Sequence, residues 1–381
     1  MLLDSSLILG IETSCDDTSA SVLEAGSCIR SNVVASQVAV HQPYGGVVPE
    51  LASRHHMLSI GAVVEEALSK ASVSLDEIGA VAVTRGPGLV GSLLVGVSVA
   101  KAIAFARRLP FIGVNHLEGH IRSNFLADPA VRLPAVSLVV SGGHTSLYEV
   151  REEGVYRRLA RTRDDAAGEA FDKVAKLLGL GYPGGPVVDR LAERGNPRGV
   201  RFATVKMSDG SLDFSFSGLK TAAARFAREH GLEARTPSAN AIDAPVAADP
   251  DQPASSGVAP AAGAADHPVH DAAGVANVPP IVLDLCASFR RAVVDTLADR
   301  TFRAARDLGA ASVCVSGGVA CNLELRRAFT AQAAALGLGV QFPPPALSTD
   351  NAAMIAAAGW LHLRRGETSG WDMTADPDLE L

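Results

Sequence analysis

The chain has 381 residues, which is too long for one ordinary hydrophobic core, so two domains are expected. Hydrophobic residues make up 48% of the chain and aromatic residues only 5%, so the cores must be built from alanine, valine, leucine and isoleucine. The formal net charge of -7 argues against a protein that coats nucleic acid by bulk electrostatics, but it leaves room for a local basic face.

The five cysteines form no Cys-x-x-Cys pair, and their odd number is typical of reduced thiols in a cytosolic protein. Asp4 precedes the first apolar run and no basic segment does, so no signal peptide is expected. The longest apolar helical stretch, 92–105, contains Lys101 and is too short to span a bilayer. We therefore expect a soluble, cytoplasmic protein without a membrane segment.

Two β-hairpins of the same layout occur in the chain. Leu7–Ile11 and Ser19–Leu23 are predicted strands joined by a polar turn, and Val136–Val140 and Ser146–Val150 repeat the pattern around a second polar turn. Two equivalent hairpins indicate two structurally similar domains.

Strand–helix units follow the hairpins. Ala80–Val83 leads into a predicted helix at Leu89–Ala106, and Ser312–Val315 leads into one that starts near Asn322. This alternation predicts an α/β protein with open sheets.

Residues 233–280 break the pattern, because they contain no aromatic residue and no lysine and are crowded with alanine, proline, aspartate and serine. Such a stretch cannot bury enough apolar area to offset its chain entropy. We predict a disordered insertion between the helices Gly218–His230 and Ile281–Ala305.

The most informative stretch is Asn115–His120, which follows a predicted buried strand at Phe111–Val114. His116 and His120 are four residues apart and project from the same face of a helical turn. Two neutral imidazoles aimed at one point can hold a borderline divalent metal. Two surface histidines on an ordinary helix are the alternative, but α/β proteins place their sites just past the ends of such strands.

Gly86–Gly91 matches the dinucleotide pattern G-x-G-x-x-G, but no acidic residue follows about 20 positions later. We interpret it as a tight turn into a helix packed through Gly91, Gly96 and Ala100. No P-loop motif occurs.

Two glycine turns, Ser141–Gly143 and Ser316–Gly318, can offer backbone N–H groups to a phosphate. Each could be a structural turn. Their occurrence together beside a histidine pair favours a nucleotide or another phosphorylated ligand.

Asp164–Lys173 is predicted to open a helix that Asp164 or Asp165 caps, with Glu169 and Asp172 on one face. Tyr182–Pro186 is predicted to be a rigid loop that a ligand can approach closely.

Asp350 precedes a small-residue helix at Ala352–Ala358. It is either the N-cap of that helix or an oxygen ligand that completes a His-His-Asp set, and spacing does not choose between them. A zincin protease would need glutamate directly after the first histidine. Leu117 stands there, and Glu118 would point away from the histidine face.

Eight motifs carry a family resemblance in chain order: Gly10–Asp16, Tyr44–Arg54, Gly86–Leu89, His116–His120, Ser141–Thr145, Asp164–Lys173, Phe214–Lys220 and Thr349–Asn351. With these motifs the chain resembles the universal family of tRNA N6-adenosine threonylcarbamoyltransferases, in its bacterial form (TsaD), from Leu7 to about Trp360. The resemblance implies an actin-like ATPase (ASKHA) fold with two related α/β domains around a cleft. The expected domains are 7–118 with 345–362, and 119–344 interrupted by the insertion at 233–280.

The resemblance implies one divalent metal per subunit, iron(II) first and zinc second, held by His116, His120 and Asp350. Asn115 stands where a further histidine would occur in relatives, and it is expected not to be a ligand. The implied substrate contacts are Val139, Val140, Ser141, Gly142, Gly143, Asp172, Gly185, Asp189 and Asn322.

The implied reaction transfers the threonylcarbamoyl group from threonylcarbamoyl-AMP to N6 of the adenosine 3′ of the anticodon, in tRNAs reading codons that begin with A, and releases AMP. We assign Glu12 as the catalytic group that takes the amine proton or orients the acceptor. The implied partners are tRNA, an inactive paralogue (TsaB) and a small ATPase (TsaE).

Alternative functions are an actin-fold small-molecule kinase or ATPase, a metalloprotease, and a non-catalytic partner subunit. Bulk charge does not predict RNA binding, and we expect tRNA to be held partly by the partner proteins. A basic cluster lacks interleaved aromatic residues and fits a solvated face at least as well as an RNA surface. Its members are Arg151, Arg157, Arg158, Arg161 and Arg163.

Overall fold

The computed structural model describes residues 6–203, 207–233 and 278–381, so most of the predicted insertion lies outside the described residues. The described residues form two five-stranded sheets, ordered β3-β2-β1-β4-β5 and β8-β7-β6-β9-β10. In each sheet three antiparallel strands continue into two parallel ones. The repeat predicted from the two hairpins is therefore confirmed.

The strands of the first sheet are β1 (Leu7–Glu12), β2 (Asp17–Glu24), β3 (Cys28–Ser36), β4 (Ile78–Gly86) and β5 (Phe111–Asn115). Those of the second are β6 (Ala135–Val140), β7 (Thr145–Glu152), β8 (Val155–Arg161), β9 (Ser312–Ser316) and β10 (Gly339–Gln341). The helices are α1 (Val38–His41), α2 (Pro49–Ala71), α3 (Val90–Arg107), α4 (His116–Ala127), α5 (Ala167–Leu177), α6 (Gly184–Ala192), α7 (Ser217–Glu229), α8 (Pro280–Asp307), α9 (Leu323–Leu336), α10 (Pro345–Ser348) and α11 (Ala352–Arg364). Short 3₁₀ helices lie at Gln42–Tyr44 and Gly318–Cys321.

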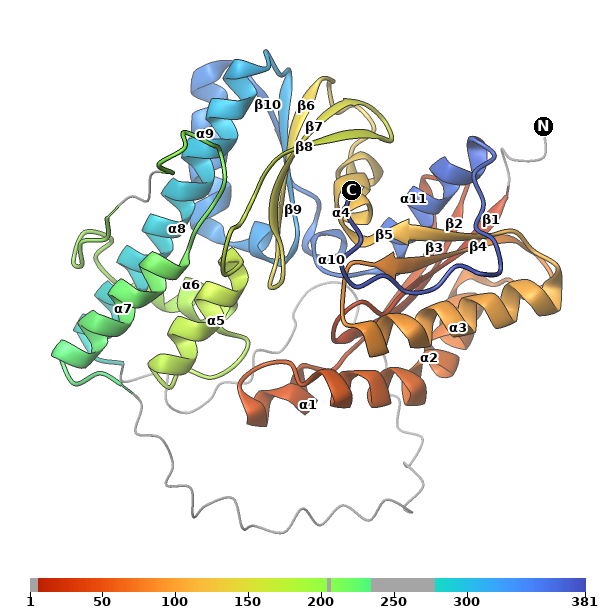
Figure 1. The fold of residues 1–381 in the computed structure, drawn as a ribbon, viewed down its shortest axis with the longest axis horizontal. Helices are drawn as coiled ribbons and strands as arrows, with labels where there is room; N and C mark the ends of the chain where they lie inside the picture. Colours follow the sequence, from red (N-terminus) through yellow and green to blue (C-terminus); the bar gives the residue numbers. More distant parts are fainter. Residues whose placement is uncertain (1–5, 204–206, 234–277) are drawn as a thin grey trace, which may run out of the picture.

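The first lobe consists of the first sheet with α2 and α3 on one face and α11 on the other (Figure 1). Alternate β1 residues serve the two faces, because side chains of a strand point to opposite sides. Leu9 and Ile11 pack towards α2 and α3, whereas Ile8 packs towards α11. A strand buried on both faces explains why β1 is almost continuously apolar.

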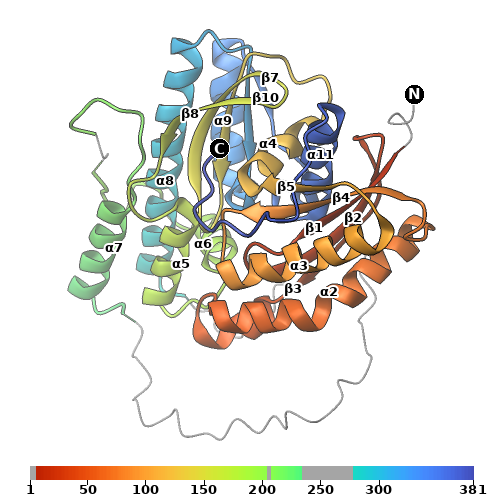
Figure 2. The same ribbon diagram turned by 45° about the vertical axis from the view of Figure 1, so that its right-hand side comes forward.

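The second lobe consists of the second sheet with α5 to α9. Its larger core joins β6 and β7 to these helices. The other face of the sheet is covered by α4. Because α4 also contacts α11 and β5, it lies between the two lobes (Figure 2). The expected domain boundary at residue 118 falls within this helix, and these boundaries stay a prediction.

Among the described residues, α3 is the one helix that is long and apolar enough to cross a membrane. The helix has 18 residues and is longer than the apolar stretch 92–105. The prediction that this region is too short to cross a bilayer is therefore wrong on length. The helix lies along β4 and α2, and the Lys101 ammonium donates to the carbonyl of Trp371 at 2.8 Å. These contacts are typical of a helix that covers the sheet of a folded domain.

The interpretation of Gly86–Gly91 as a tight turn into a packed helix agrees with the contacts of its glycines. A Cβ at Gly91 would lie 2.4 Å from Ser53 Oγ on α2, and one at Gly96 would lie 2.3 Å from Thr13 Oγ1. The C-terminal segment covers the loop, since the Gly88 N–H donates to the carbonyl of Pro377. The loop is therefore engaged in packing on both sides.

The prediction that Asp164 or Asp165 caps the following helix is wrong. Helix α5 begins at Ala167, and its first N–H donates to Thr145 Oγ1 from β7 at 2.9 Å. Asp164 instead accepts hydrogen bonds from the Phe216 and Ser217 N–H groups at the start of α7. The Thr145 hydroxyl on β7 thus accepts from the first N–H of α5, and Asp164 caps the start of α7 instead.

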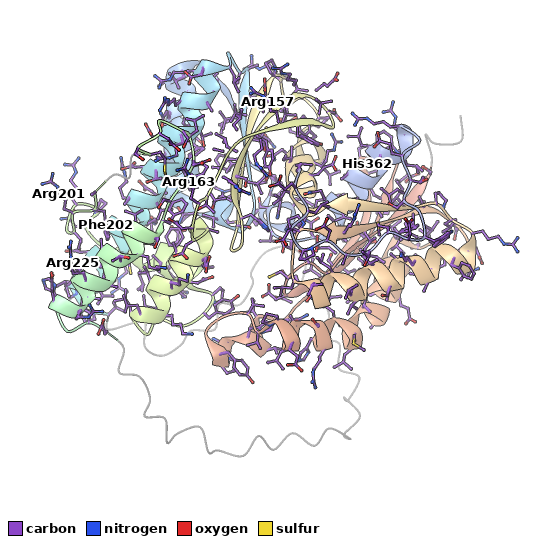
Figure 3. All side chains as sticks on the ribbon, in the orientation of Figure 1. Arg157, Arg163, Arg201, Phe202, Arg225 and His362 are labelled. Carbon is purple, nitrogen blue, oxygen red and sulfur yellow. The ribbon has the colours of Figure 1, made fainter. Side chains whose placement is uncertain are left out.

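An ion pair connects α4 to α11 on the side away from the histidine pair. Glu118 Oε2 lies 2.8 Å from His362 Nε2, which fits the expectation that Glu118 points away from that face. His362 is labelled on α11 in Figure 3. The hydrogen bond to Glu118 raises the pKa of His362 to about 9. The charged imidazole therefore fastens α11 to α4.

Replacing His362 with glutamine is expected to lower the free energy of unfolding at pH 6, by at most about 3 kcal/mol, because a raised pKa stabilises the charged state. A histidine raised above its unfolded value contributes fully below about pH 6.5, and the contribution disappears as pH rises towards 9. Urea unfolding at pH 6 and pH 10 measures the difference. An equal loss at both pH values would contradict this assignment.

Candidate metal centre and substrate loops

His116 and His120 lie on α4 where the helix leaves β5. The Asn115 side chain accepts a hydrogen bond from the Leu117 N–H at 2.9 Å, so Asn115 is the N-cap of α4. This cap starts the helix at His116 and directs the two rings to one side, with centroids 4.7 Å apart. Asn115 is therefore occupied as a cap, in agreement with the expectation that it is not a ligand.

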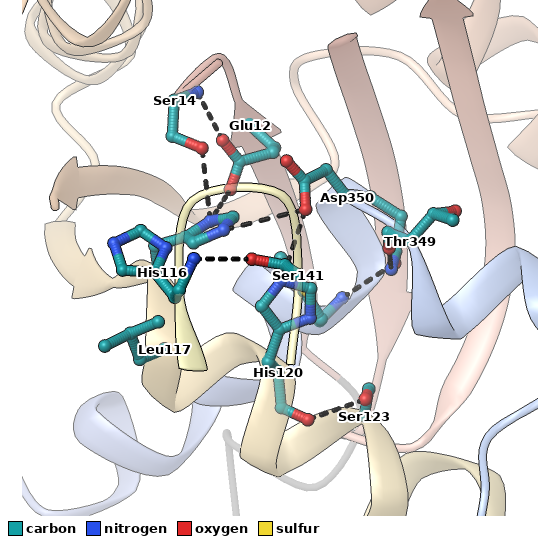
Figure 4. Close-up of polar contacts among 12 residues, drawn as sticks. Glu12, Ser14, His116, Leu117, His120, Ser123, Ser141, Thr349 and Asp350 are labelled. Atoms are coloured by element: carbon teal, nitrogen blue, oxygen red, sulfur yellow. Dashed lines mark hydrogen bonds and ion pairs between the residues drawn. The ribbon is translucent and has the colours of Figure 1, made fainter. Parts of the chain in front are cut away.

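Asp350 lies between α10 and α11 and faces both rings (Figure 4). Its Oδ1 is 3.2 Å from His120 Nε2 and 3.6 Å from His116 Nε2. The N-cap of α11 is Asn351, whose side chain accepts from the Met354 N–H at 3.1 Å. Of the two interpretations of Asp350, the N-cap is thus excluded, and the side chain is left to complete the His-His-Asp group.

Close packing of α11 brings Asp350 to the histidines. A Cβ at Gly119, between them on α4, would lie 2.8 Å from Ile355 Cδ1. A Cβ at Gly10 on β1 would lie 2.3 Å from the carbonyl oxygen of Ala352. Only glycine at both places lets α11 approach so closely, and this fixes the position of Asp350 at the start of that helix.

The three groups polarise one another. Burial acts to lower the pKa of His116, but the carboxylates of Glu12 and Asp350 raise it to about 9. Burial, aided by the charge of His116, lowers the pKa of His120. Burial acts to raise the pKa of Asp350, but the two imidazoles hold it below its usual range. The centre therefore contains an ionised carboxylate beside one charged and one neutral imidazole.

The donor set fits a divalent metal. One ligand atom from each of His116, His120 and Asp350 lies within 4.8 Å of the others. His120 is fully buried, and neither of its ring nitrogens has a hydrogen-bond partner among the described residues. Its Nε2 contacts Asp350 at 3.2 Å without a well-formed hydrogen bond, and a buried imidazole in that state is costly unless it binds something. Two imidazoles and a carboxylate suit iron(II) or zinc.

Glu12 ends β1 behind His116 and is fully buried. Its Oε1 accepts from the Ser14 N–H, and its Oε2 accepts from Thr84 Oγ1 at 2.6 Å and contacts His116 Nδ1 at 2.9 Å (Figure 4). Both oxygens are occupied and neither meets solvent. Both roles expected for Glu12, taking the amine proton or orienting the acceptor, stay predictions, and its burial behind His116 favours an indirect role.

The residues expected to touch substrate form one connected wall in the second lobe. The Ser141 carbonyl accepts from the Gly168 N–H at the start of α5, and Asp172 on α5 accepts from the Gly184 N–H at 2.8 Å. A Cβ at Gly317 would lie 2.3 Å from the Val140 carbonyl oxygen. The β6–β7 turn, the starts of α5 and α6 and the 3₁₀ turn are thereby held together.

Open space lies beside four glycines of this wall. A Cβ added at Gly142, Gly143, Gly185 or Gly318 would meet no atom within 4 Å. Packing of the chain on itself therefore gives no reason for glycine there. Exposed N–H groups beside open space are what an anionic ligand needs.

Two of the expected substrate contacts, Asp189 and Asn322, already make hydrogen bonds within the chain. Asp189 accepts from Arg290 Nη1 at 2.7 Å through one oxygen and from the Leu323 N–H at 3.0 Å through the other. Asn322 caps α9 by accepting from the Leu325 N–H at 3.0 Å, and its amide nitrogen is not used in the cap. Asp189 thus braces the wall, which leaves Asn322 better placed than Asp189 to meet a ligand.

His144 is a neighbour of the centre that the sequence analysis quoted within a motif but did not assign. Its ring centroid lies 6.0 Å from that of His116, and it comes from the turn that carries Gly142 and Gly143. Burial, together with His116 and His120, lowers its pKa to about 4, so the imidazole is neutral. The place of this histidine directly after the Ser-Gly-Gly turn was the available signal.

The basic cluster lies on β7, β8 and the following turn, and Figure 3 labels two of its members, Arg157 and Arg163. All its arginines are paired with carboxylates, which is the arrangement of a solvated face. The pairs are Arg151–Glu149, Arg157–Glu149, Arg158–Glu380, Arg161–Glu380, Arg163–Asp209 and Arg163–Asp213.

Comparison with known proteins identifies the family. A family model described as tRNA N6-adenosine threonylcarbamoyltransferase matches residues 28–357. This chain belongs to that family. It is 50% identical over 369 residues to the tRNA N6-adenosine threonylcarbamoyltransferase of Geobacter metallireducens, covering 97% of this chain and 95% of the relative. It is 48% identical over 375 residues to that of Anaeromyxobacter dehalogenans, covering 98% and 99%.

The fold of this threonylcarbamoyltransferase family member is also found in solved structures. HypF of T. kodakarensis matches with a TM-score of 0.56 at 12% identity, over 95% of this chain and 48% of that chain. Full-length HypF in a phosphate- and nucleotide-bound form matches with a TM-score of 0.55 at 13% identity, over 96% and 56%. These likenesses concern the fold alone. The expected actin-like ATPase fold of two α/β lobes is confirmed.

Proposed function

We propose that this chain transfers the threonylcarbamoyl group from threonylcarbamoyl-AMP to N6 of the adenosine 3′ of the anticodon, in tRNAs reading codons that begin with A. The amine nitrogen forms a bond to the carbamoyl carbon and loses one proton to solvent, the bond from that carbon to the phosphate oxygen breaks, and AMP leaves with the bonding electrons. The observation that carries the proposal is the His116–His120–Asp350 group facing a wall of open glycine turns, in a chain of this family.

One divalent ion, iron(II) first and zinc second, would be held by His116, His120 and Asp350. When bound, the ion supplies Lewis-acid stabilisation of negative charge on the carbamoyl or phosphate oxygen. The chain supplies the orientation of the ligands, because α4 and α11 are held against each other at Gly119. The donor set supports this assignment, and metal analysis of the purified protein tests it.

The glycine wall would hold the adenylate. The backbone N–H groups of Gly142 and Gly143 can bind its phosphate, and the Asn322 amide can bind a polar group of the nucleotide. The Ser141 N–H already donates to the His144 carbonyl and the Gly185 N–H to Asp172, so these two residues would contact the ligand through other atoms. Val139 and Val140 form the buried floor below the turn. Asp172 braces the start of α6, and burial raises its pKa to about 6. Asp189 holds α9 through the Leu323 N–H, so its contact to the ligand would be indirect.

We propose further that the protein acts in the cytoplasm with tRNA, and with an inactive paralogue and a small ATPase as protein partners. A paired rather than free arginine cluster supports the expectation that partners contribute to tRNA binding. Electrophoretic mobility shifts of unmodified tRNA, with this protein alone and with both partners, test that division of labour.

The deciding assay contains the purified protein, its partner proteins, threonine, bicarbonate, ATP, an adenylate synthase and unmodified tRNA. Mass spectrometry of the nucleosides should show threonylcarbamoyladenosine. Phosphate transfer to a small molecule without tRNA would indicate a kinase of the same fold instead. Metal-dependent cleavage of casein would indicate a protease.

Replacing Gly143 with valine should keep the fold, because its side chain would enter open space rather than packed atoms. The same side chain should obstruct the adenylate and raise its KM at least about tenfold, the size of losing one good polar contact. Steady-state transfer measures this. A matched control is Gly61→Ala on the exposed face of α2, which should leave KM unchanged.

A further inference from the structure

We infer that Glu12 is a positioning residue that fixes the proton of His116 on Nδ1, so that Nε2 is free to bind the metal. The inference rests on the metal assignment in the proposed function. It replaces the direct proton transfer that the sequence suggested for Glu12.

The two nitrogens of the His116 ring face different groups. Nδ1 faces Glu12 Oε2 at 2.9 Å and Ser14 Oγ at 3.2 Å. Nε2 faces Asp350 Oδ1 at 3.6 Å, on the side shared with His120. A carboxylate accepts hydrogen bonds and cannot donate them, so Nδ1 must carry a proton that it donates to Glu12. When the charged ring gives up its second proton, Nε2 is therefore the nitrogen left bare.

The position of Glu12 is itself fixed from two other elements. The Ser14 N–H holds Oε1, and Thr84 Oγ1 on β4 holds Oε2 at 2.6 Å. These donors satisfy a fully buried carboxylate, which would otherwise be very unfavourable. Removing a carboxylate that orients a metal-binding histidine commonly lowers metal affinity by about 10- to 100-fold.

His120 has no such partner. Its Nε2 lies 3.2 Å from Asp350 Oδ1, but its Nδ1 has no hydrogen-bond partner among the described residues, so no group behind the ring fixes its tautomer as Glu12 does for His116. The two histidines are therefore unequal: His116 is oriented before the metal arrives, whereas His120 is oriented by binding it.

Glu12→Gln makes a sharp test because the neighbours dictate how the amide lies. The Ser14 N–H needs an acceptor, so the amide oxygen must take the Oε1 position. The NH₂ group then takes the Oε2 position and donates to His116 Nδ1, which moves the ring proton to Nε2. A side chain of almost the same shape thus leaves His116 Nε2 protonated and unable to bind the metal.

The experiment measures zinc affinity by chelator competition, and the His116 tautomer by ¹⁵N–¹H correlation of the zinc-loaded, ¹⁵N-histidine-labelled protein. We expect a protonated Nδ1 in the wild type, and zinc affinity lowered about 10- to 100-fold in Glu12→Gln. Thr84→Val is the matched control. It removes one donor to Oε2 and leaves the other contacts of Glu12, so its zinc affinity should stay within about threefold of the wild type.

A wild-type His116 without a proton on Nδ1 would overturn the inference, and this spectrum needs no variant to fold. Zinc affinity of Glu12→Gln within about threefold of the wild type would also overturn it, and transfer lost at unchanged affinity would restore direct proton transfer. A wild type that binds no zinc would overturn both this inference and the metal assignment. A confirmed tautomer with no transfer to tRNA would overturn the proposed reaction alone.

Discussion

His116→Ala is expected to lose bound metal and to lower threonylcarbamoyl transfer at least about a thousandfold, because Lewis-acid stabilisation supplies several kcal/mol. The variant removes one of the three proposed ligands found among the described residues. It also leaves the buried Glu12 carboxylate without its imidazole partner. Metal content by mass spectrometry, together with the transfer assay, measures both losses.

Two companion variants separate chemistry from folding. Asp350→Asn keeps the size of the side chain and removes its charge, so it should also lose metal and transfer. His230→Ala changes a histidine that stacks on Phe226 at the end of α7, and it should keep both. A metal-free His116→Ala protein with full transfer would refute the mechanism.

Gly10→Ala is expected to lower the free energy of unfolding by about 3 kcal/mol and to weaken metal binding, because the core there has no room for another atom. The added Cβ would lie 2.3 Å from the Ala352 carbonyl oxygen and 2.9 Å from Ala356 Cβ. Relief of this clash must push α11 away from β1. The movement carries Asp350 away from His116 and His120, so zinc affinity should fall although no ligand is changed.

Urea unfolding and chelator competition measure the two effects of Gly10→Ala. Gly61→Ala provides the contrast, because Gly61 lies in the interior of α2 with open space around it. That change should raise the free energy of unfolding by about 0.5–1 kcal/mol. Equal stability of Gly10→Ala and the wild type would show that α11 yields without cost.

Local patterns in the sequence predicted the elements that depend on neighbouring residues. The two hairpins follow from apolar strands separated by polar turns, and each is present at the expected place. The histidine pair follows from helical spacing, and its rings do lie together. The predicted start of α5 failed because its first N–H is satisfied by Thr145, a residue that local capping rules do not consider.

The candidate site could be predicted from spacing only in part. Asp350 and Asn351 are both good N-cap residues, and nothing local tells which one is left to face the histidines. The family resemblance made that choice, and the α4–α11 packing explains it. The environment of Glu12 was beyond sequence reasoning, because its partners Thr84 and His116 lie 72 and 104 positions away.

Since α4 and α11 pack on each other, all three metal-ligand candidates belong to one rigid unit. His144 and the glycine turns belong to the opposite lobe. Because α4 also packs on β6 and β9, a hinge rotation that keeps both sets of α4 contacts would leave every distance within the ligand triad constant. Exchange of AMP for a fresh adenylate would then require no rearrangement of the three proposed ligands, so the same ion could stay bound over many turnovers.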